Sequence, residues 1–231
     1  MASDYELARG RPDSLDTLVE WPAELDAIGD PAGLAVLDVG CGNGGKSLEL
    51  SARGASRVVG LDVTEGFLPV PEGADVRFRQ HDLSRLADLA VDEPSRFDRV
   101  LFLSSLGYAD DEVATLVAAR QLLRPGGAVV VARTSPIRYA VERSERDGGG
   151  LGVAYHDSEP WTYRPSWDPS IELSRRTRKF SDILNSFSAA GLRVAGCTEP
   201  RLSSEQAELY PHKQQWMDRY VGIVIFRLEV T

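Results

Sequence analysis

The sequence predicts an α/β fold built on a parallel sheet with helices on both faces, and three observations support this prediction. Segments of strand and helix character alternate from Leu34 to Ala132, as they do in chains of βαβ units. The first strand, 34–39, is apolar except for Asp38, which is typical of a strand buried on both faces. It ends in a glycine-rich turn, Gly40–Gly45, at the carboxyl end of the strand, where parallel sheets bind ligands.

The other predicted elements follow in a regular order. An amphipathic helix over 5–24, interrupted at Trp21–Pro22, precedes the first strand. Further strands are expected over 57–62, 76–80, 99–104 and 128–132, and helices over 46–53 and 110–123. A mixed segment at 138–154 and an aromatic stretch at 155–167 come next. A helix at 181–190 and strands at 192–197 and 222–230 then predict an antiparallel hairpin at the sheet edge.

Composition places the chain among globular proteins and excludes several classes of function. The 231 residues carry a net charge of −9, and an acidic surface repels phosphate backbones, so nucleic acid is not an expected partner. Two cysteines, Cys41 and Cys197, are too few for a disulfide framework, which fits a reducing, cytoplasmic compartment. No leader segment is recognised, and no apolar run approaches the roughly 20 residues that span a bilayer. Lysine is rare among the basic residues, which indicates a GC-rich bacterial genome.

The glycine turn fits two patterns. Gly40, Gly42 and Gly45 match G-x-G-x-x-G, which is the dinucleotide-binding fingerprint of nicotinamide-dependent dehydrogenases. Gly40, Gly42 and Gly44, preceded by Asp38, match an acidic-x-G-x-G-x-G pattern instead. A plain strand–helix connection is a third interpretation, because glycine serves any tight turn.

Acidic residues lie at the ends of three successive predicted strands, and they favour one class of ligand. Asp38, Asp62 and Asp82 lie at the ends of the first, second and third predicted strands. A carboxylate at Asp62 can accept hydrogen bonds from both ribose hydroxyls. Asp82 can accept one from the exocyclic amine of adenine, while the N–H of Leu83 can donate to a ring nitrogen. A pyrophosphate would prefer fewer carboxylates nearby, so this arrangement suits a neutral or cationic nucleoside without phosphate.

Five motifs in a fixed order carry a resemblance to a known family. They are Val36–Gly44, Val59–Thr64, His81–Leu83, Phe97–Val100 and Leu122–Gly127. With them the chain resembles the class I S-adenosylmethionine-dependent methyltransferases, closely over 34–132 and more loosely as far as 181–191. The resemblance implies a Rossmann-like, doubly wound, seven-stranded sheet with an antiparallel last strand. It also implies a single domain over 1–231, with an N-terminal helical cap at 1–30, a cofactor-binding half at 34–132, and a substrate cap with the C-terminal strands at 134–231.

The resemblance implies roles for individual residues around S-adenosylmethionine and its product, S-adenosylhomocysteine. The expected cofactor-binding residues are Asp38, Gly40, Gly42, Asp62, Val63, Asp82, Leu83 and Ser104. Among these, Gly40 and Gly42 line the methionine moiety and Ser104 faces the sulfonium end, with Tyr108 beside it on the acceptor side. Family members that methylate nucleic-acid or protein nitrogens often carry an Asn/Asp-Pro-Pro-Tyr-like motif here. The segment Leu103–Leu106 lacks that motif, which favours a small-molecule acceptor.

The aromatic stretch supplies the remaining candidates. His156 is the proposed general base, since an acceptor hydroxyl usually benefits from one. Large aromatic side chains can close an apolar pocket over an acceptor or pack a lid against the sheet. They are Tyr155, Trp161, Tyr163 and Trp167. No Cys/His cluster has metal-ligand spacing, so no metal is expected.

The sequence therefore predicts a cytoplasmic methyltransferase that modifies a small molecule, such as a specialised metabolite in bacterial biosynthesis. Two alternatives stay open. One is a nicotinamide-dependent dehydrogenase that uses the same glycine turn. The other is a non-methylating protein of the same fold, either a cofactor-binding regulator or a pericyclase, because fold does not fix function.

Overall fold

The computed structural model describes residues 10–92, 96–164, 170, 172–175 and 178–231. The chain divides into two compact units. The first, here called the sheet unit, comprises Ala23–Arg133, Asn185–Thr198 and Ile225–Thr231. The second, here called the helical unit, draws on Met1–Pro22, Thr134–Leu184 and Glu199–Val224. The two units are described separately below.

A seven-stranded sheet forms the core of the sheet unit. Its order is β3-β2-β1-β4-β5-β9-β8. The strands are β1 (Ala35–Val39), β2 (Arg57–Asp62), β3 (Val76–Gln80), β4 (Phe97–Leu103), β5 (Leu123–Thr134), β8 (Leu192–Thr198) and β9 (Ile223–Val230). The first five pair in parallel, while β8 and β9 pair antiparallel. This confirms the predicted α/β sheet with its antiparallel last strand.

The parallel register brings the strand ends together at one edge of the sheet. Val39 of β1 lies opposite Leu61 of β2, and Asp62 lies opposite Gln80 of β3. On the other side of β1, Asp38 lies opposite Leu101 of β4. The turns that follow β1 to β4 therefore emerge from the same edge, which is where the candidate site is built.

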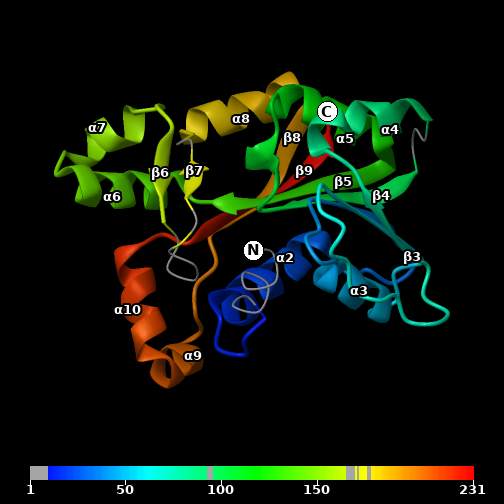
Figure 1. Ribbon diagram of the computed structural model, residues 1–231, viewed down its shortest axis with the longest axis horizontal. Coiled ribbons are helices and arrows are strands. Elements are labelled where there is room, and N and C mark those ends of the chain that lie inside the picture. The colour runs from blue at the N-terminus through cyan, green and yellow to red at the C-terminus, as the bar shows by residue number, and fades with distance from the viewer. Residues whose placement is uncertain (1–9, 93–95, 165–169, 171, 176–177) are drawn as a thin grey trace. The chain divides into compact units, whose positions relative to one another are not determined.

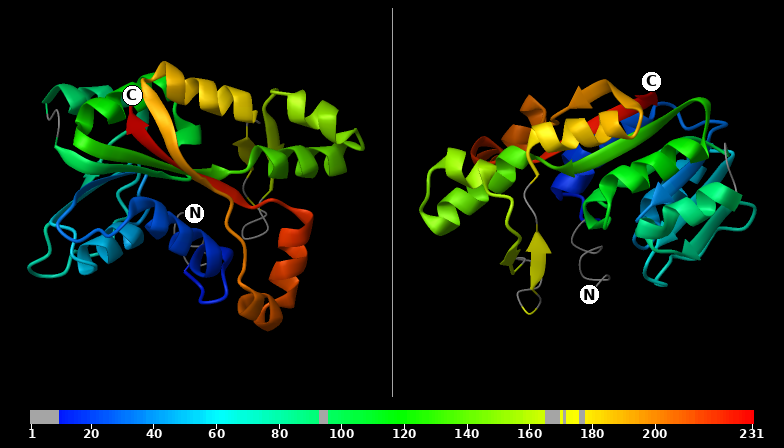
Figure 2. Two further views of the ribbon diagram at one scale, coloured as in Figure 1. Left: turned by 180° about the vertical axis from the view of Figure 1, so that it is seen from behind. Right: turned by 90° about the horizontal axis from the view of Figure 1, so that it is seen from above.

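Helices cover both faces of this sheet, as its buried strands require. Helix α3 (Gly45–Ala52) lies on one face, and α4 (Leu86–Asp92) and α5 (Glu112–Leu122) lie on the other (Figures 1 and 2). Helix α8 (Phe180–Ala189) contributes Phe187, whose ring packs edge-on against Phe226 of β9 at 5.1 Å. Two 3₁₀ turns, η2 (Leu83–Arg85) and η3 (Leu106–Tyr108), follow β3 and β4.

The helical unit contains most of the elements that the sequence did not reveal. The segment 138–154, predicted as mixed, forms α6 (Pro136–Asp147) and α7 (Leu151–His156). The aromatic stretch contributes β6 (Trp161–Tyr163), which pairs antiparallel with β7 (Leu173–Arg175). Helices α9 (Ser204–Leu209) and α10 (Pro211–Arg219) complete the unit. Helix α10 is held to α6 by Arg219 and Tyr220, which both donate to the Glu145 carboxylate, at 2.9 and 2.8 Å.

The predicted break at Trp21–Pro22 is wrong. The π-helical segment η1 (Asp16–Glu20) continues directly into the α-helix α2 (Trp21–Ile28) at that point. Pro22 is the second residue of α2 and supplies no N–H donor, yet the helix continues through it to Ile28.

An aromatic ring fixes the turn after β1. A Cβ atom added to Gly44 would lie 2.2 Å from Phe78 Cζ, and one added to Gly60 would lie 2.6 Å from Phe78 Cδ1. Phe78 in turn stacks on Phe67, with 4.9 Å between ring centroids and 8° between the planes. Glycine at both positions therefore lets Phe78 of β3 reach under the turn, and an isolated glycine within a strand is typical of such a close approach.

We predict that Gly60→Ala lowers the free energy of unfolding by about 2 kcal/mol, because the added methyl group overpacks this contact. Urea unfolding measures the change. Gly66→Ala is the matched control, since its Cβ would meet nothing within 4 Å. In a Gly60→Ala/Phe78→Leu double variant, the loss of unfolding free energy should be smaller than the sum of the losses in the two single variants. Equal stability of Gly60→Ala and Gly66→Ala would contradict the contact.

Candidate functional site

The glycine turn after β1 adopts the left-handed backbone conformation at alternate residues. The φ angles of Gly40, Gly42 and Gly44 are 76°, 60° and 85°. Gly45 is the first residue of α3 and has no positive φ. The three glycines with a left-handed backbone are thus those of the acidic-x-G-x-G-x-G pattern. Gly45, the third glycine of the G-x-G-x-x-G pattern, begins the helix instead.

The loop after β4 packs directly on this turn. A Cβ atom on Gly40 would lie 2.3 Å from Ser105 Cβ, and the buried Ser105 hydroxyl donates to the carbonyl oxygen of Val39. Ser104 precedes it with a φ of 68°, the one positive value among the described non-glycine residues. Such strained positions cluster at functional sites. The structure therefore places Ser104 at the carboxyl end of β4, beside the glycine turn, as the sequence predicts.

Asp62 joins the ends of β1 and β2. Its Oδ2 accepts a hydrogen bond from the Gly42 N–H at 2.8 Å. Its Oδ1 accepts two from Thr64, at 2.9 Å from the backbone nitrogen and 2.8 Å from the hydroxyl. Each carboxylate oxygen has two lone pairs, so Asp62 orders the turn and Oδ2 keeps acceptor capacity for a further donor.

The remaining predicted nucleoside contacts lie along the same edge. Val63 follows Asp62, and its side chain is 66% exposed. Asp82 is exposed and caps η2, where its Oδ1 accepts from the Ser84 N–H at 2.9 Å. Leu83 begins η2 and is half-buried. Because β2 and β3 are neighbouring strands, the apolar side chain of Val63 and the carboxylate of Asp82 are both available to a ligand at this edge.

Asp38 is the buried member of the three strand-end carboxylates. Burial, the largest cause, raises its pKa from 3.8 to about 6, although a hydrogen bond from Ser47 and the charge of Lys46 both favour ionisation. The Ser47 hydroxyl donates to Asp38 Oδ2 at 2.7 Å. The carboxylates of Glu24 and Asp62 also raise the pKa. A positively charged ligand at this edge would relieve that repulsion.

Sequence reasoning missed the Glu24–Lys46 ion pair. Glu24 lies on α2 and Lys46 in the first turn of α3, with 2.5 Å between Oε2 and Nζ. Glu24 is fully buried. The two residues are 22 positions apart and no local pattern links them, so only the folded structure identifies the pair.

The acceptor-side candidates lie mainly in the helical unit. His156 is the last residue of α7 and is exposed, with its ring edge-on to Tyr155 at 5.4 Å. The Tyr155 hydroxyl accepts a hydrogen bond from the Phe180 N–H at 3.0 Å. Trp161 and Tyr163 lie on β6, and Trp167 lies outside the described residues. Tyr108, in the sheet unit, is 74% exposed.

A buried arginine holds the segment that follows His156. Arg143 of α6 pairs with the Asp157 carboxylate and donates to the Glu159 carbonyl oxygen at 2.8 Å. Burying a guanidinium group is costly unless it is paired, so these contacts fix the end of α7. Arg143 is thus a second residue that the sequence did not single out.

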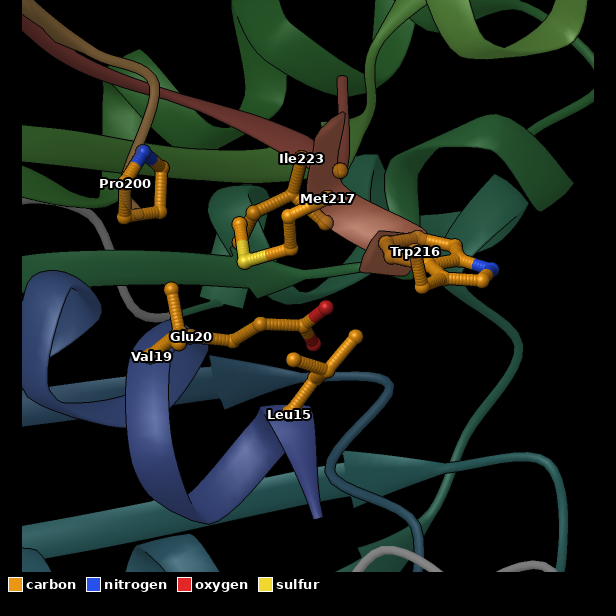
Figure 3. Close-up of a pocket in the computed structure, with 8 residues that line it drawn as sticks. Leu15, Val19, Glu20, Pro200, Trp216, Met217 and Ile223 are labelled. Carbon is orange, nitrogen blue, oxygen red and sulfur yellow. The ribbon is translucent and has the colours of Figure 1, made fainter. Parts of the chain in front are cut away.

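A small pocket lies within the helical unit (Figure 3). It is lined mostly by apolar side chains, with one carboxylate. The residues are Leu15, Val19, Glu20, Pro200, Trp216, Met217, Gly222 and Ile223. Its space is little more than a water molecule needs, so it is too small to hold a nucleoside.

The described part of the chain has neither a metal-binding cluster nor a helix suited to crossing a membrane. No group of three or more His, Cys, Asp or Glu side chains is arranged to hold a metal ion. Among the same residues, no helix combines the length and the apolar character that crossing a membrane requires.

Comparison with known proteins identifies the domain that carries the glycine turn. Residues 36–127 match a family model described as a methyltransferase domain. Residues 36–127 are thus similar to methyltransferase domains, in agreement with the motifs that the sequence carries. The match begins in β1 and ends within β5, so the methyltransferase domain includes the turn and the strand ends at Asp38, Asp62 and Asp82.

Individual relatives resemble this chain to different extents. Ubiquinone biosynthesis O-methyltransferase of Pseudomonas syringae pv. tomato is 36% identical over 117 residues, which are 48% of this chain and 47% of that protein. The chain therefore spans about half the length of the curated relatives it matches. A methyltransferase structure from Mesorhizobium loti matches with a TM-score of 0.68 at 19% identity, over 90% of this chain and 96% of that one.

A third protein is similar in fold. It is 1,6-didemethyltoxoflavin-N1-methyltransferase of Burkholderia thailandensis, solved with 1,6-didemethyltoxoflavin and S-adenosylhomocysteine bound. Its TM-score is 0.56 at 18% identity, over 100% of this chain and 88% of that one. At such identity the two structures establish the shared fold of the methyltransferase domain.

We predict that Asp38→Asn removes a pH-dependent loss of stability. Since the folded-state pKa is raised from 3.8 to about 6, the folded protein binds more protons between these values, and its stability falls as pH rises through this window. The loss is complete above the raised pKa and reaches about 3 kcal/mol. An asparagine side chain at this position cannot ionise and can still accept the Ser47 hydrogen bond.

Urea unfolding between pH 4 and 7.5 measures the difference between the variant and the wild type. The advantage of Asp38→Asn should be largest at pH 7.5 and small at pH 4. Asp88→Asn, in an exposed pair with Arg85, serves as the control. A variant that is less stable than the wild type at pH 7.5 would contradict the raised pKa.

Proposed function

We propose that this chain is an S-adenosylmethionine-dependent methyltransferase that acts on a small molecule in bacterial biosynthesis, in the cytoplasm. The observation that carries the proposal is the set of strand-end carboxylates around a left-handed glycine turn. Asp38, Asp62 and Asp82 offer negative charge and hydrogen-bond acceptors at a single edge of the sheet. These carboxylates fit a cationic nucleoside better than a pyrophosphate, which argues against the dehydrogenase alternative.

Each residue would bind one part of the cofactor. Gly40 and Gly42 would line the methionine moiety, because no side chain keeps a ligand away from the backbone there. Asp62 would accept from the ribose hydroxyls. Val63 would pack on the adenine, whose edge Asp82 and Leu83 would read. Ser104 would face the sulfonium end.

When bound, S-adenosylmethionine supplies an electrophilic methyl group on a positively charged sulfur. The protein then contributes mainly position, because two reactants held in line react much faster than free ones. His156 would accept a proton from an acceptor that must lose one. Tyr108, Tyr155, Trp161, Tyr163 and Trp167 would contact the acceptor.

The similarities to known proteins support the proposed identity of the cofactor more strongly than that of the acceptor. The Pseudomonas relative is named an O-methyltransferase, but its match covers about half of each chain. The Burkholderia enzyme is named an N1-methyltransferase. We therefore commit to a small-molecule acceptor without choosing between oxygen and nitrogen.

Incubation with S-adenosylmethionine carrying a radiolabelled methyl group tests the proposal. A panel of small phenolic, enolic and heterocyclic acceptors should include one that becomes labelled in the presence of the protein. Binding of the cofactor without transfer to any acceptor would favour the alternative of a non-methylating regulator or pericyclase.

We predict that Asp62→Ala weakens S-adenosylhomocysteine binding at least a hundredfold, because the ribose loses its acceptor and the turn loses the Gly42 hydrogen bond. Isothermal titration calorimetry measures the affinity, and circular dichroism confirms the fold. Asp75→Ala is the control, since Asp75 precedes the opposite end of β3 and is half-exposed in a pair with Arg77. Unchanged affinity in Asp62→Ala would refute the ribose role.

We predict that His156→Ala lowers kcat at least tenfold while S-adenosylhomocysteine affinity stays within twofold of the wild type. The reason is that a general base acts on the acceptor and leaves cofactor binding unaffected. The comparison needs an acceptor found in the labelling experiment, and His212→Ala, at the start of α10, is the control. A normal kcat would exclude His156 as the base.

A further inference from the structure

The Glu24–Lys46 ion pair leaves one buried oxygen without a hydrogen bond. Lys46 Nζ lies 2.5 Å from Glu24 Oε2. Oε1 of the same carboxylate is buried and has no hydrogen-bond partner among the described residues. The Glu24 side chain is 0% exposed and that of Lys46 is 19% exposed. Because buried polar atoms are nearly always hydrogen-bonded, Oε1 requires a donor that the described protein atoms do not provide.

The pair lies next to the proposed cofactor site. Lys46 is adjacent to Ser47, whose hydroxyl donates to Asp38 at 2.7 Å. Both residues of the pair act electrostatically on Asp38, Lys46 by stabilising its charge and Glu24 by opposing it. Lys46 also follows the glycine turn directly, in the first turn of α3.

The local charges are not balanced. The carboxylates of Glu24, Asp38 and Asp62 interact around Asp38, and Lys46 is the cation among the groups that act on it. The excess is negative in a region where two of the three carboxylates are buried. A ligand with a net positive charge would restore the balance.

We propose that Glu24 and Lys46 bind the amino-acid end of S-adenosylmethionine. Glu24 accepts a hydrogen bond from the α-ammonium group through Oε1, and Lys46 donates to the α-carboxylate. A carboxylate–ammonium pair in the protein is the electrostatic complement of the ammonium–carboxylate pair of an amino acid. This inference rests on the proposed placement of the cofactor at the glycine turn.

The competing interpretation is that the pair only joins α2 to α3. Three unreactive ligands distinguish the two roles. S-adenosylhomocysteine carries both charged groups, its decarboxylated analogue keeps the ammonium group alone, and 5′-methylthioadenosine has neither. A merely structural pair would affect the binding of all three ligands equally.

Isothermal titration calorimetry of the full chain gives the test. Glu24→Gln should weaken S-adenosylhomocysteine and its decarboxylated analogue at least tenfold each, and leave 5′-methylthioadenosine within twofold. Lys46→Met should weaken S-adenosylhomocysteine at least tenfold and leave the other two ligands within twofold. Lys46→Arg keeps the charge and should recover most of the affinity for S-adenosylhomocysteine.

A double variant keeps the test valid if a single variant fails to fold. Removing one partner of a buried ion pair leaves the other charge unpaired, whereas removing both does not. Glu24→Gln/Lys46→Met should therefore fold and bind 5′-methylthioadenosine normally, yet bind S-adenosylhomocysteine about a hundredfold more weakly. Glu49→Gln/Arg53→Met is the matched control, because this exposed pair lies on the same helix at 2.7 Å, and it should change none of the three affinities.

Two results would overturn the inference. One is an equal loss of affinity for S-adenosylhomocysteine and 5′-methylthioadenosine in the folded double variant, and the other is no loss for either ligand. Wild-type protein that binds none of the three ligands would instead overturn the proposed function, and this inference with it.

Discussion

The close packing of Gly40 against Ser105 is the contact on which the rest of the site depends. It leaves no room for a side chain at Gly40, since a Cβ there would lie 2.3 Å from Ser105 Cβ. Ser104, the residue before Ser105, has a left-handed backbone with a φ of 68°. The end of β4 is thereby fixed against the turn after β1. The contact therefore holds Gly40 and Ser104, two of the proposed cofactor-binding residues, in one geometry.

Electrostatics supports the ligand selectivity that we propose for the same edge of the sheet. Parallel strands bring Asp38, Asp62 and Asp82 to one edge, and burial makes ionisation of Asp38 costly. The mutual repulsion of these carboxylates is unfavourable without a ligand, and a bound cation would offset it. The three carboxylates together therefore fit the cationic nucleoside that we propose as the ligand.

Local patterns predict the parts of the structure that depend on neighbours in sequence. The strands β2 and β3 have the predicted bounds, because apolar runs bounded by turn residues identify buried strands. Gly40, Asp62 and Asp82 are predictable from the sequence, because each lies at the end of such a strand. The choice between two glycine patterns needed the backbone angles, which showed that Gly45 belongs to α3.

Other features depend on contacts between distant residues, and the sequence does not reveal them. Phe78 under the glycine turn and Glu24 beside Lys46 are examples, since each joins separate elements. Helix α6 is predictable in principle, because Ser135 is a favourable N-cap residue and Pro136 a favourable first residue. Its mainly polar composition, however, makes the helix hard to recognise from apolar periodicity. The roles of His156 and of the aromatic residues at 155–167 remain proposals, because these residues belong to a unit that the family match does not include.

We propose that the edge around Gly40, Asp38 and Asp62 selects a phosphate-free nucleoside with a charged amino-acid end. Parallel calorimetric titrations of the wild-type protein with S-adenosylhomocysteine and with NAD test this claim most directly. We expect saturable, one-to-one binding of S-adenosylhomocysteine at micromolar concentrations and no measurable binding of NAD. Tight binding of NAD without binding of S-adenosylhomocysteine would contradict it.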